Sequence, residues 1–229
     1  MTHHDSSPTA RSHMGSRQLA ALREELSVRD LAILEDVERF RLLTTRHIQR
    51  LHFDHSRHAT LGAATKACMR VLIRLSGTHN LVVALNEQKR RRGGARRGSE
   101  QLIWQLASRG EALLRHARGG EGRRRYMSPS HEFVKHTLEV SSLGVLLREA
   151  EQRREIEIVE LAVEGLAYRY YVGRQGSRQS LEPDLYAITA GDEYEHHWFI
   201  EADCGTERGP HLQRKLDAYR SAVGLCPQG

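Results

Sequence analysis

Residues 182–203 read EPDLYAITAGDEYEHHWFIEAD, and they decide the fold of the second half of the chain. One apolar run follows Pro183-Asp184, and another ends at Ile200, immediately before Glu201. Two strands with acids at these ends are predicted to lie side by side, which places Asp184 and Glu201 together at one edge of a sheet. Carboxylate oxygens are the ligands that hard cations prefer. One interpretation of this pattern is therefore a Mg²⁺ site formed by Asp184 and Glu201.

The same two acids have a second interpretation that needs no metal. Carboxylates at the ends of surface strands are common, and they are usually solvated. One of them also has Arg214 or Lys215 as a possible partner, from a helix predicted over residues 210–223. His136 and Glu139 share a face of another predicted helix and are candidates to support the acids. Both interpretations stay open at this point.

Charge divides the 229 residues into two unlike halves. Residues 1–127 hold 24 Lys and Arg against 12 Asp and Glu, a net charge of +12, whereas residues 128–229 hold 11 against 17, a net charge of −6. A basic segment suits a polyanion as its partner. The first half is therefore expected to meet nucleic acid.

Cysteine usage and hydropathy favour a reduced, non-membrane environment. Cys68, Cys204 and Cys226 are odd in number and far apart, without the spacing of a disulfide framework or a zinc site. No apolar run approaches the roughly 18 residues needed to cross a bilayer, and no secretory signal is recognisable. We expect a cytoplasmic protein with no membrane partner.

The first half shows the pattern of a DNA-binding domain. Residues 1–22 are polar and lack hydrophobic periodicity, which predicts a disordered leader. Ser27 is a favourable N-cap for a helix over 28–40, Thr44 or Thr45 for a shorter helix, and a third helix is predicted to begin near Thr60. Strands at 80–85 and 101–106 and a closing helix at 108–116 follow. This order is typical of a winged helix-turn-helix domain, predicted over residues 23–127.

Basic residues gather at two places in this predicted domain. Six cations lie among glycines in the loop between the two strands, where a chain can follow a line of phosphates, although an arginine run alone is more often a solvated loop. Further cations recur at helical spacing on the third helix, whose threonines are candidates for base contacts. The predicted contacts to double-stranded DNA are Thr60, Thr65, Lys66, Arg70, Arg74, Lys89, Arg90, Arg91, Arg92, Arg96 and Arg97.

Four histidines crowd around the turn before the third helix: His47, His52, His55 and His58. Imidazoles at such spacings can bind zinc or nickel. No cysteine or acid completes a recognisable ligand set, so we prefer the interpretation of a polar loop.

The second half, residues 128–229, reads as a small α/β domain, and the whole chain as α+β. A long amphipathic helix is predicted over 131–154, and a last helix over 210–223. Strands are predicted between them, at 156–161, 167–172, 184–189 and 197–200. A helix, several short strands and a returning helix favour an α/β arrangement.

At these residues the second half resembles the restriction-endonuclease-like superfamily, named for its PD-(D/E)XK signature. Pro183-Asp184 matches the first part and Glu201-Ala202-Asp203 the second, except that Asp203 stands where the signature has lysine. The helix from Gln213 to Tyr219 resembles a glutamine-to-tyrosine motif of some branches. Over residues 28–222 the chain more closely resembles the replication-relaxation family of plasmids and other mobile elements, which places a winged helix ahead of such a segment.

The resemblance implies a DNA-binding protein involved in plasmid replication or relaxation. If the site is active, its catalytic residues are Asp184, Glu201, Asp203 and Lys215, with Lys215 replacing the missing lysine. An aspartate at the lysine position opposes stabilisation of the charge that develops on phosphate, and the last strand expected of this fold does not follow the final helix. We therefore lean against an enzyme. Binding requires no cofactor, although Mg²⁺ is possible.

Two alternatives remain: a Mg²⁺-dependent DNA nuclease, and a winged-helix transcriptional regulator whose second domain serves dimerisation. Besides double-stranded DNA, a second copy of the chain or other replication or mobilisation proteins are possible partners.

Overall fold

Helices dominate the first half of the chain, and strands are concentrated in the second. The computed structural model describes residues 15–53, 58–85, 102–120, 129–173, 176–191, 193–203 and 209–223. Its elements make a mixed α+β fold with three small sheets, which confirms the predicted class at that level. In the described ranges, no helix combines the length and apolar character needed to cross a membrane.

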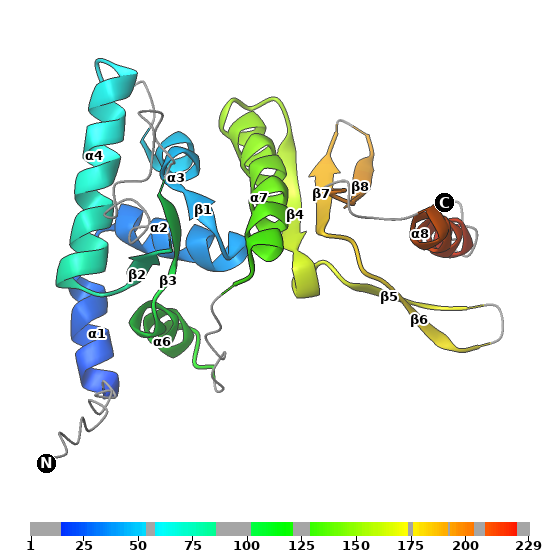
Figure 1. Ribbon diagram of the computed structural model, residues 1–229, viewed down its shortest axis with the longest axis horizontal. Coiled ribbons are helices and arrows are strands. Elements are labelled where there is room, and N and C mark those ends of the chain that lie inside the picture. The colour runs from blue at the N-terminus through cyan, green and yellow to red at the C-terminus, as the bar shows by residue number, and fades with distance from the viewer. Residues whose placement is uncertain are drawn as a thin grey trace, which may run out of the picture.

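The first half is built from helices around a short antiparallel sheet (Figure 1). Its elements are α1 (Ser16–Glu25), α2 (Val28–Phe40), β1 (Leu43–Thr44), α3 (Thr45–His52), α4 (Leu61–Ile73), the π-helix η2 (Arg74–Thr78), β2 (Val82–Ala84), β3 (Ile103–Leu106) and α6 (Ser108–Ala117). The first sheet has the order β1-β3-β2. The sequence predicted α2, α3, α4 and α6, and the strands β2 and β3, to within a few residues. It did not predict α1, η2 or β1.

The predicted helix caps are present. Ser27 accepts a hydrogen bond from the backbone N–H of Asp30, Thr44 accepts one from His47, and Thr60 accepts one from Ala63. Each side chain satisfies one of the N–H groups that a helix start leaves without an intrahelical partner. This local chemistry explains why the starts of α2, α3 and α4 were predictable.

The disordered leader predicted for residues 1–22 is wrong for residues 16–22, which belong to α1. Leu19, Leu22 and Leu26 lie on one side of this segment and are buried in the main core, where α1 packs against α6. Three leucines among polar residues are a narrow apolar stripe. Tertiary burial stabilises the helix, so the local composition was a poor guide.

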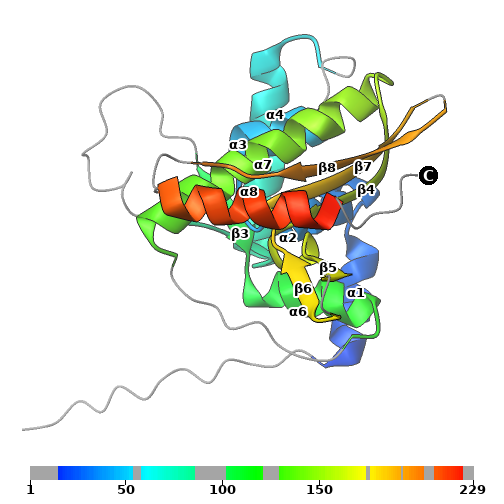
Figure 2. The ribbon, with the colours of Figure 1, turned by 90° about the vertical axis from the view of Figure 1, so that its right-hand side faces the viewer.

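The second half is a sheet with a helix on each side (Figures 1 and 2). Its elements are α7 (His131–Gln152), β4 (Glu157–Val163), the 3₁₀ turn η3 (Glu164–Leu166), β5 (Arg169–Val172), β6 (Arg178–Leu181), β7 (Leu185–Ala190), β8 (Glu195–Ile200) and α8 (Gly209–Val223). The second sheet is antiparallel with the order β4-β7-β8, and β5 pairs with β6 in a separate hairpin. Helix α7 covers one face of the second sheet, and α8 lies over the other.

The two halves share a hydrophobic core. One cluster of buried residues extends from Leu19 in α1 to Ala187 in β7, with Val140 and Val145 of α7 between them. The predicted boundary between domains, after residue 127, lies outside the described residues and stays a prediction.

Helix α7 joins the halves through a close backbone approach. Gly144 lies against the ring of Phe40, so that a Cβ at position 144 would be 2.2 Å from Phe40 Cε1. One turn earlier, the Ser141 hydroxyl lies 2.8 Å from the carbonyl of Leu42 and 2.7 Å from that of Thr137. Only glycine permits this separation of α7 and α2.

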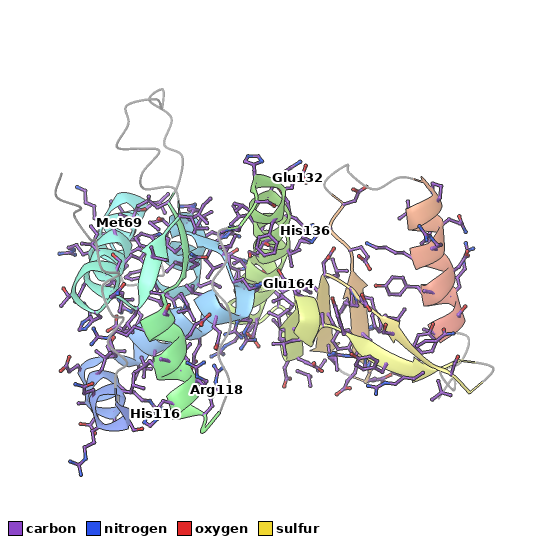
Figure 3. The ribbon with its side chains drawn as sticks, turned by 60° about the horizontal axis from the view of Figure 1, so that its bottom comes forward. Met69, His116, Arg118, Glu132, His136 and Glu164 are labelled. Carbon is purple, nitrogen blue, oxygen red and sulfur yellow. The ribbon has the colours of Figure 1, made fainter. Side chains whose placement is uncertain are left out.

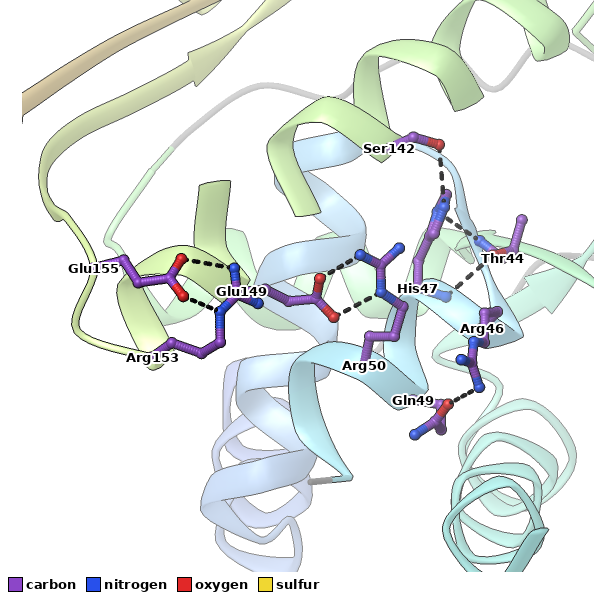
Figure 4. Close-up of polar contacts among 9 residues, drawn as sticks. All are labelled: Thr44, Arg46, His47, Gln49, Arg50, Ser142, Glu149, Arg153 and Glu155. Carbon is purple, nitrogen blue, oxygen red and sulfur yellow. Dashed lines mark hydrogen bonds and ion pairs between the residues drawn. The ribbon is translucent and has the colours of Figure 1, made fainter. Parts of the chain in front are cut away.

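Polar contacts continue the same interface toward α3 (Figure 4). Arg50 donates two hydrogen bonds to the Glu149 carboxylate, one of them 2.6 Å long, and this contact lowers the pKa of Glu149. The imidazole of His47 lies between Thr44 and Ser142. Because Ser142 donates its proton to the Leu138 carbonyl, its oxygen is left to accept from His47 Nε2–H, while Nδ1 accepts from the Thr44 N–H. The network therefore requires a neutral His47.

We predict that Gly144→Ala destabilises the protein by about 1–3 kcal/mol, because the added methyl group displaces the buried Phe40 ring. Urea unfolding measures the loss. Gly165→Ala is the matched control, since nothing lies within 4 Å of a Cβ at that position, and it should change stability by less than about 0.5 kcal/mol. Equal effects of the two substitutions would show that the contact with Phe40 does not limit packing.

We also predict a stability that depends on the protonation of His47. Burial, followed by the charge of Arg50, lowers the pKa of His47 from 6.5 to about 4. Between these values the unfolded chain binds a proton that the folded chain does not, so the free energy of unfolding falls as the pH is lowered from 6.5 toward 4, by roughly 2–4 kcal/mol. Unfolding experiments across this range should show a shallower dependence for His47→Gln. An unchanged pH dependence in the variant would contradict the assignment.

Candidate functional site

The hairpin of β7 and β8 brings the two predicted acids together. The strands pair antiparallel with Leu185 opposite Ile200, so Asp184, directly before β7, and Glu201, directly after β8, occupy facing positions at the same end of the sheet. Both side chains are partly buried, with 21% exposure for Asp184 and 25% for Glu201. The predicted adjacency agrees with this geometry.

Asp184 is held by α7 and by the backbone after β8. One of its oxygens lies 3.0 Å from His136 Nε2, and the other accepts a 2.8 Å hydrogen bond from the backbone N–H of Ala202. Figure 3 labels His136 on α7, beside the sheet that carries Asp184. The contact between His136 and Asp184 supports the interpretation of His136 as a supporting residue, whereas Glu139 is exposed.

Glu201 is held by α8. Lys215 Nζ donates to one carboxylate oxygen at 2.9 Å, and the Tyr219 hydroxyl donates to the other at 2.6 Å. The two donors are four residues apart and so share one face of the helix. Burial, the hydrogen bond to Glu201 and the charges of Glu201 and Asp184 raise the pKa of Tyr219, which keeps its hydroxyl protonated as a donor.

Tyr219 is the functional residue whose role the sequence did not reveal. Its ring packs edge-on against Phe199 of β8, with 5.8 Å between ring centroids. The spacing of Lys215 and Tyr219 was the available signal, because residues at i and i+4 meet the same surface. Of the two cations proposed as partners, Lys215 bonds Glu201, whereas Arg214 donates to the Pro210 carbonyl of its own helix.

The donor set does not fit a metal ion as it is arranged. All four oxygens of Asp184 and Glu201 have a hydrogen-bonding partner. Within the part of the chain that the structure describes, no group of three or more His, Cys, Asp and Glu side chains is placed to hold a metal ion. Asp203 is exposed, just beyond Glu201.

The predicted basic helix, α4, presents only part of the expected set to solvent. Lys66 and Arg70 are exposed, whereas the Arg74 guanidinium pairs with Asp30 of α2 at 2.6 Å. Thr60 is occupied as the N-cap, and the Thr65 hydroxyl donates to the Leu61 carbonyl. The loop cations, Lys89, Arg90, Arg91, Arg92, Arg96 and Arg97, lie outside the described residues.

The histidines before α4 point to separate partners. His47 faces Ser142, His52 lies 3.0 Å from Asp36, and His58 packs near the Phe53 ring, while His55 is outside the described residues. Cys68 is a free, buried thiol whose pKa burial raises to about 12. The preferred interpretation of a polar loop is wrong for His47 and His52, because both belong to helix α3 and pack against its neighbours, His47 being buried.

Comparison with known proteins identifies a family. No curated protein and no solved structure matches the chain significantly. The sequence profile of the replication-relaxation family matches residues 34–226, which include α2 from its seventh residue, the acidic site and α8. The chain therefore belongs to the replication-relaxation family.

Proposed function

We propose that this protein binds double-stranded DNA through its first half and acts in the replication or relaxation of a plasmid or another mobile element. Membership of the replication-relaxation family supports the biological role. The single observation that carries DNA binding is the exposed pair Lys66 and Arg70 on α4, in a half of the chain whose net charge is +12. A cytoplasmic location and self-association stay predictions.

The arrangement of the first half supports a winged helix-turn-helix domain. Helices α2, α3 and α4 follow one another with short connections, α3 packs against α4, and β2 pairs with β3 in an antiparallel hairpin. Strand β1, between α2 and α3, adds the third strand by pairing with β3. The segment with six cations lies between β2 and β3 in the sequence, and we propose it as the wing.

The contacts revise which residues of α4 we propose to meet DNA. Lys66 and Arg70 are one turn apart and exposed, so both can reach phosphates or base edges. Arg74 already pairs with Asp30, whose side chain also accepts from Ser27 at the start of α2. We therefore propose that Arg74 orients α4 against α2, and that the segment from Thr60, the N-cap of α4, to Arg70 enters the groove.

For the second half we propose a restriction-endonuclease-like fold that has lost, or does not use, cleavage. The order of a helix, five strands and a helix, with Asp184 and Glu201 at one end of the three-stranded sheet, supports the lineage. The carboxylate oxygens of these two acids already have hydrogen-bonding partners: His136, Lys215, Tyr219 and the backbone N–H of Ala202. This occupation disfavours metal binding. A Mg²⁺-dependent nuclease is the second candidate, because Lys215 returns a cation to the site that Asp203 leaves without its lysine.

Binding to duplex DNA is predicted to depend steeply on salt. Each phosphate neutralised contributes about 0.9 to the slope of log K against log salt concentration. Replacing the six loop cations with serine should lower that slope by several units, and replacing Lys66 and Arg70 by about two. Fluorescence anisotropy with a labelled duplex at a series of salt concentrations measures both. The exposed Arg17 and Arg23 of α1, also changed to serine, provide the control pair. An unchanged slope in the loop variant would remove the wing from the interface.

Cleavage of DNA is predicted to be absent. Purified protein incubated with supercoiled plasmid and Mg²⁺ or Mn²⁺ should leave the plasmid intact, as should Asp184→Ala, because both carboxylates are bonded to side chains rather than free to hold a cation. Agarose gel electrophoresis reports nicked and linear forms. Nicking by the wild-type protein that disappears in Asp184→Ala would establish the nuclease instead.

A further inference from the structure

Two helices on opposite faces of the second sheet meet the acids at its end. His136 of α7 reaches Asp184 from one side, while Lys215 and Tyr219 of α8 reach Glu201 from the other. The contacts thus connect elements from residues 131–152, 185–200 and 209–223. The Phe199–Tyr219 ring pair, with 5.8 Å between centroids, lies beside these contacts.

The partners also solve an electrostatic problem. Two carboxylates at facing strand positions repel each other when both are charged, and a nearby cation removes that cost. Lys215 supplies a full positive charge 2.9 Å from Glu201. Asp184 gains the N–H of Ala202 and the imidazole of His136. Because the Lys215 and Glu201 side chains are only 26% and 25% exposed, their attraction is screened less than that of an exposed surface pair.

We propose that Asp184 and Glu201 form a metal-independent clamp, in which His136, Lys215 and Tyr219 occupy the carboxylates and fasten α7 and α8 to the second sheet. The chain's own side chains take the role that a divalent cation has in a nuclease site. The residues that the sequence presents as metal ligands are, in this arrangement, acceptors that stabilise the fold.

The clamp and a metal site predict changes of opposite sign in the melting temperature for the isosteric substitution Glu201→Gln. In a metal site freed of its ion, Glu201→Gln removes a repulsion and raises the melting temperature. In the clamp it removes the charge that Lys215 and Tyr219 bind, so the melting temperature falls, by about 2–4 °C for each kcal/mol lost in a chain of this size. The measurement is thermal unfolding of the full chain, followed by circular dichroism in the presence of EDTA.

Added metal gives the second readout. The clamp predicts the same melting temperature for wild type in EDTA and in excess Mg²⁺ at matched ionic strength. A metal site predicts a rise with Mg²⁺ concentration, because a ligand that binds only the folded state stabilises it, and the loss of that rise in Glu201→Gln. A Mg²⁺-dependent rise of that kind, or an unchanged or raised melting temperature of Glu201→Gln in EDTA, would overturn the clamp.

Tyr219→Phe keeps the test informative if Glu201→Gln fails to fold. It removes only the hydroxyl that donates to Glu201 and leaves the ring against Phe199, so a moderate fall in melting temperature is expected. Tyr194→Phe, at a residue 71% exposed, is the matched control and should change nothing. A fall of equal size in both tyrosine variants would contradict the clamp.

A double-mutant cycle isolates the ion pair. Lys215→Met and Glu201→Gln together should cost less than the sum of the two single changes, since both remove the same interaction. Strict additivity would overturn the pairing. These readouts use protein stability alone, so their failure leaves DNA binding by the first half untouched, and a failure of the salt titration leaves the clamp untouched.

Discussion

The contact between Gly144 and the ring of Phe40 is the constraint on which the arrangement of the two halves depends. It allows α7 to approach α2 at a distance that any side chain would prevent. At that distance the Ser141 hydroxyl reaches the carbonyl of Leu42, and Val140 and Val145 join the core that begins in α1. The polar contacts to α3, Arg50 with Glu149 and His47 with Ser142, then follow from the same placement of the helix.

Helix α7 therefore contacts both halves and fixes their relative positions. Two turns before Gly144, His136 contacts Asp184 at the end of the second sheet. The acidic site and helices α2 and α3 therefore all contact the same helix, α7. Close-packed interiors transmit displacements instead of absorbing them. A change that shifts α7 against Phe40 should consequently be felt at Asp184 as well as at α3.

The sequence predicted what local chemistry determines, and missed what depends on distant packing. Ser27, Thr44 and Thr60 marked helix starts because capping acts over three residues. The adjacency of Asp184 and Glu201 was predictable because a hairpin register fixes facing positions. The helix at Ser16–Glu25 was missed because its stability comes from burial against α6, and the Arg74–Asp30 pair because it joins residues 44 apart in sequence. The role of Tyr219 depended on where α8 crosses the sheet.

If Glu201-Ala202-Asp203 is interpreted as the second part of a PD-(D/E)XK signature, the contacts change the meaning of the aspartate at position 203. Asp203 is exposed just beyond the end of β8, so no cation reaches the two carboxylates from that position. Lys215 instead approaches from α8 and donates to a Glu201 oxygen, while Tyr219 takes the other. Lys215 therefore supplies a positive charge at the site, but its ammonium group is already hydrogen-bonded to the Glu201 carboxylate. The positive charge at the carboxylates therefore comes from helix α8 and not from the residue at position 203, which is the arrangement that the proposed clamp requires.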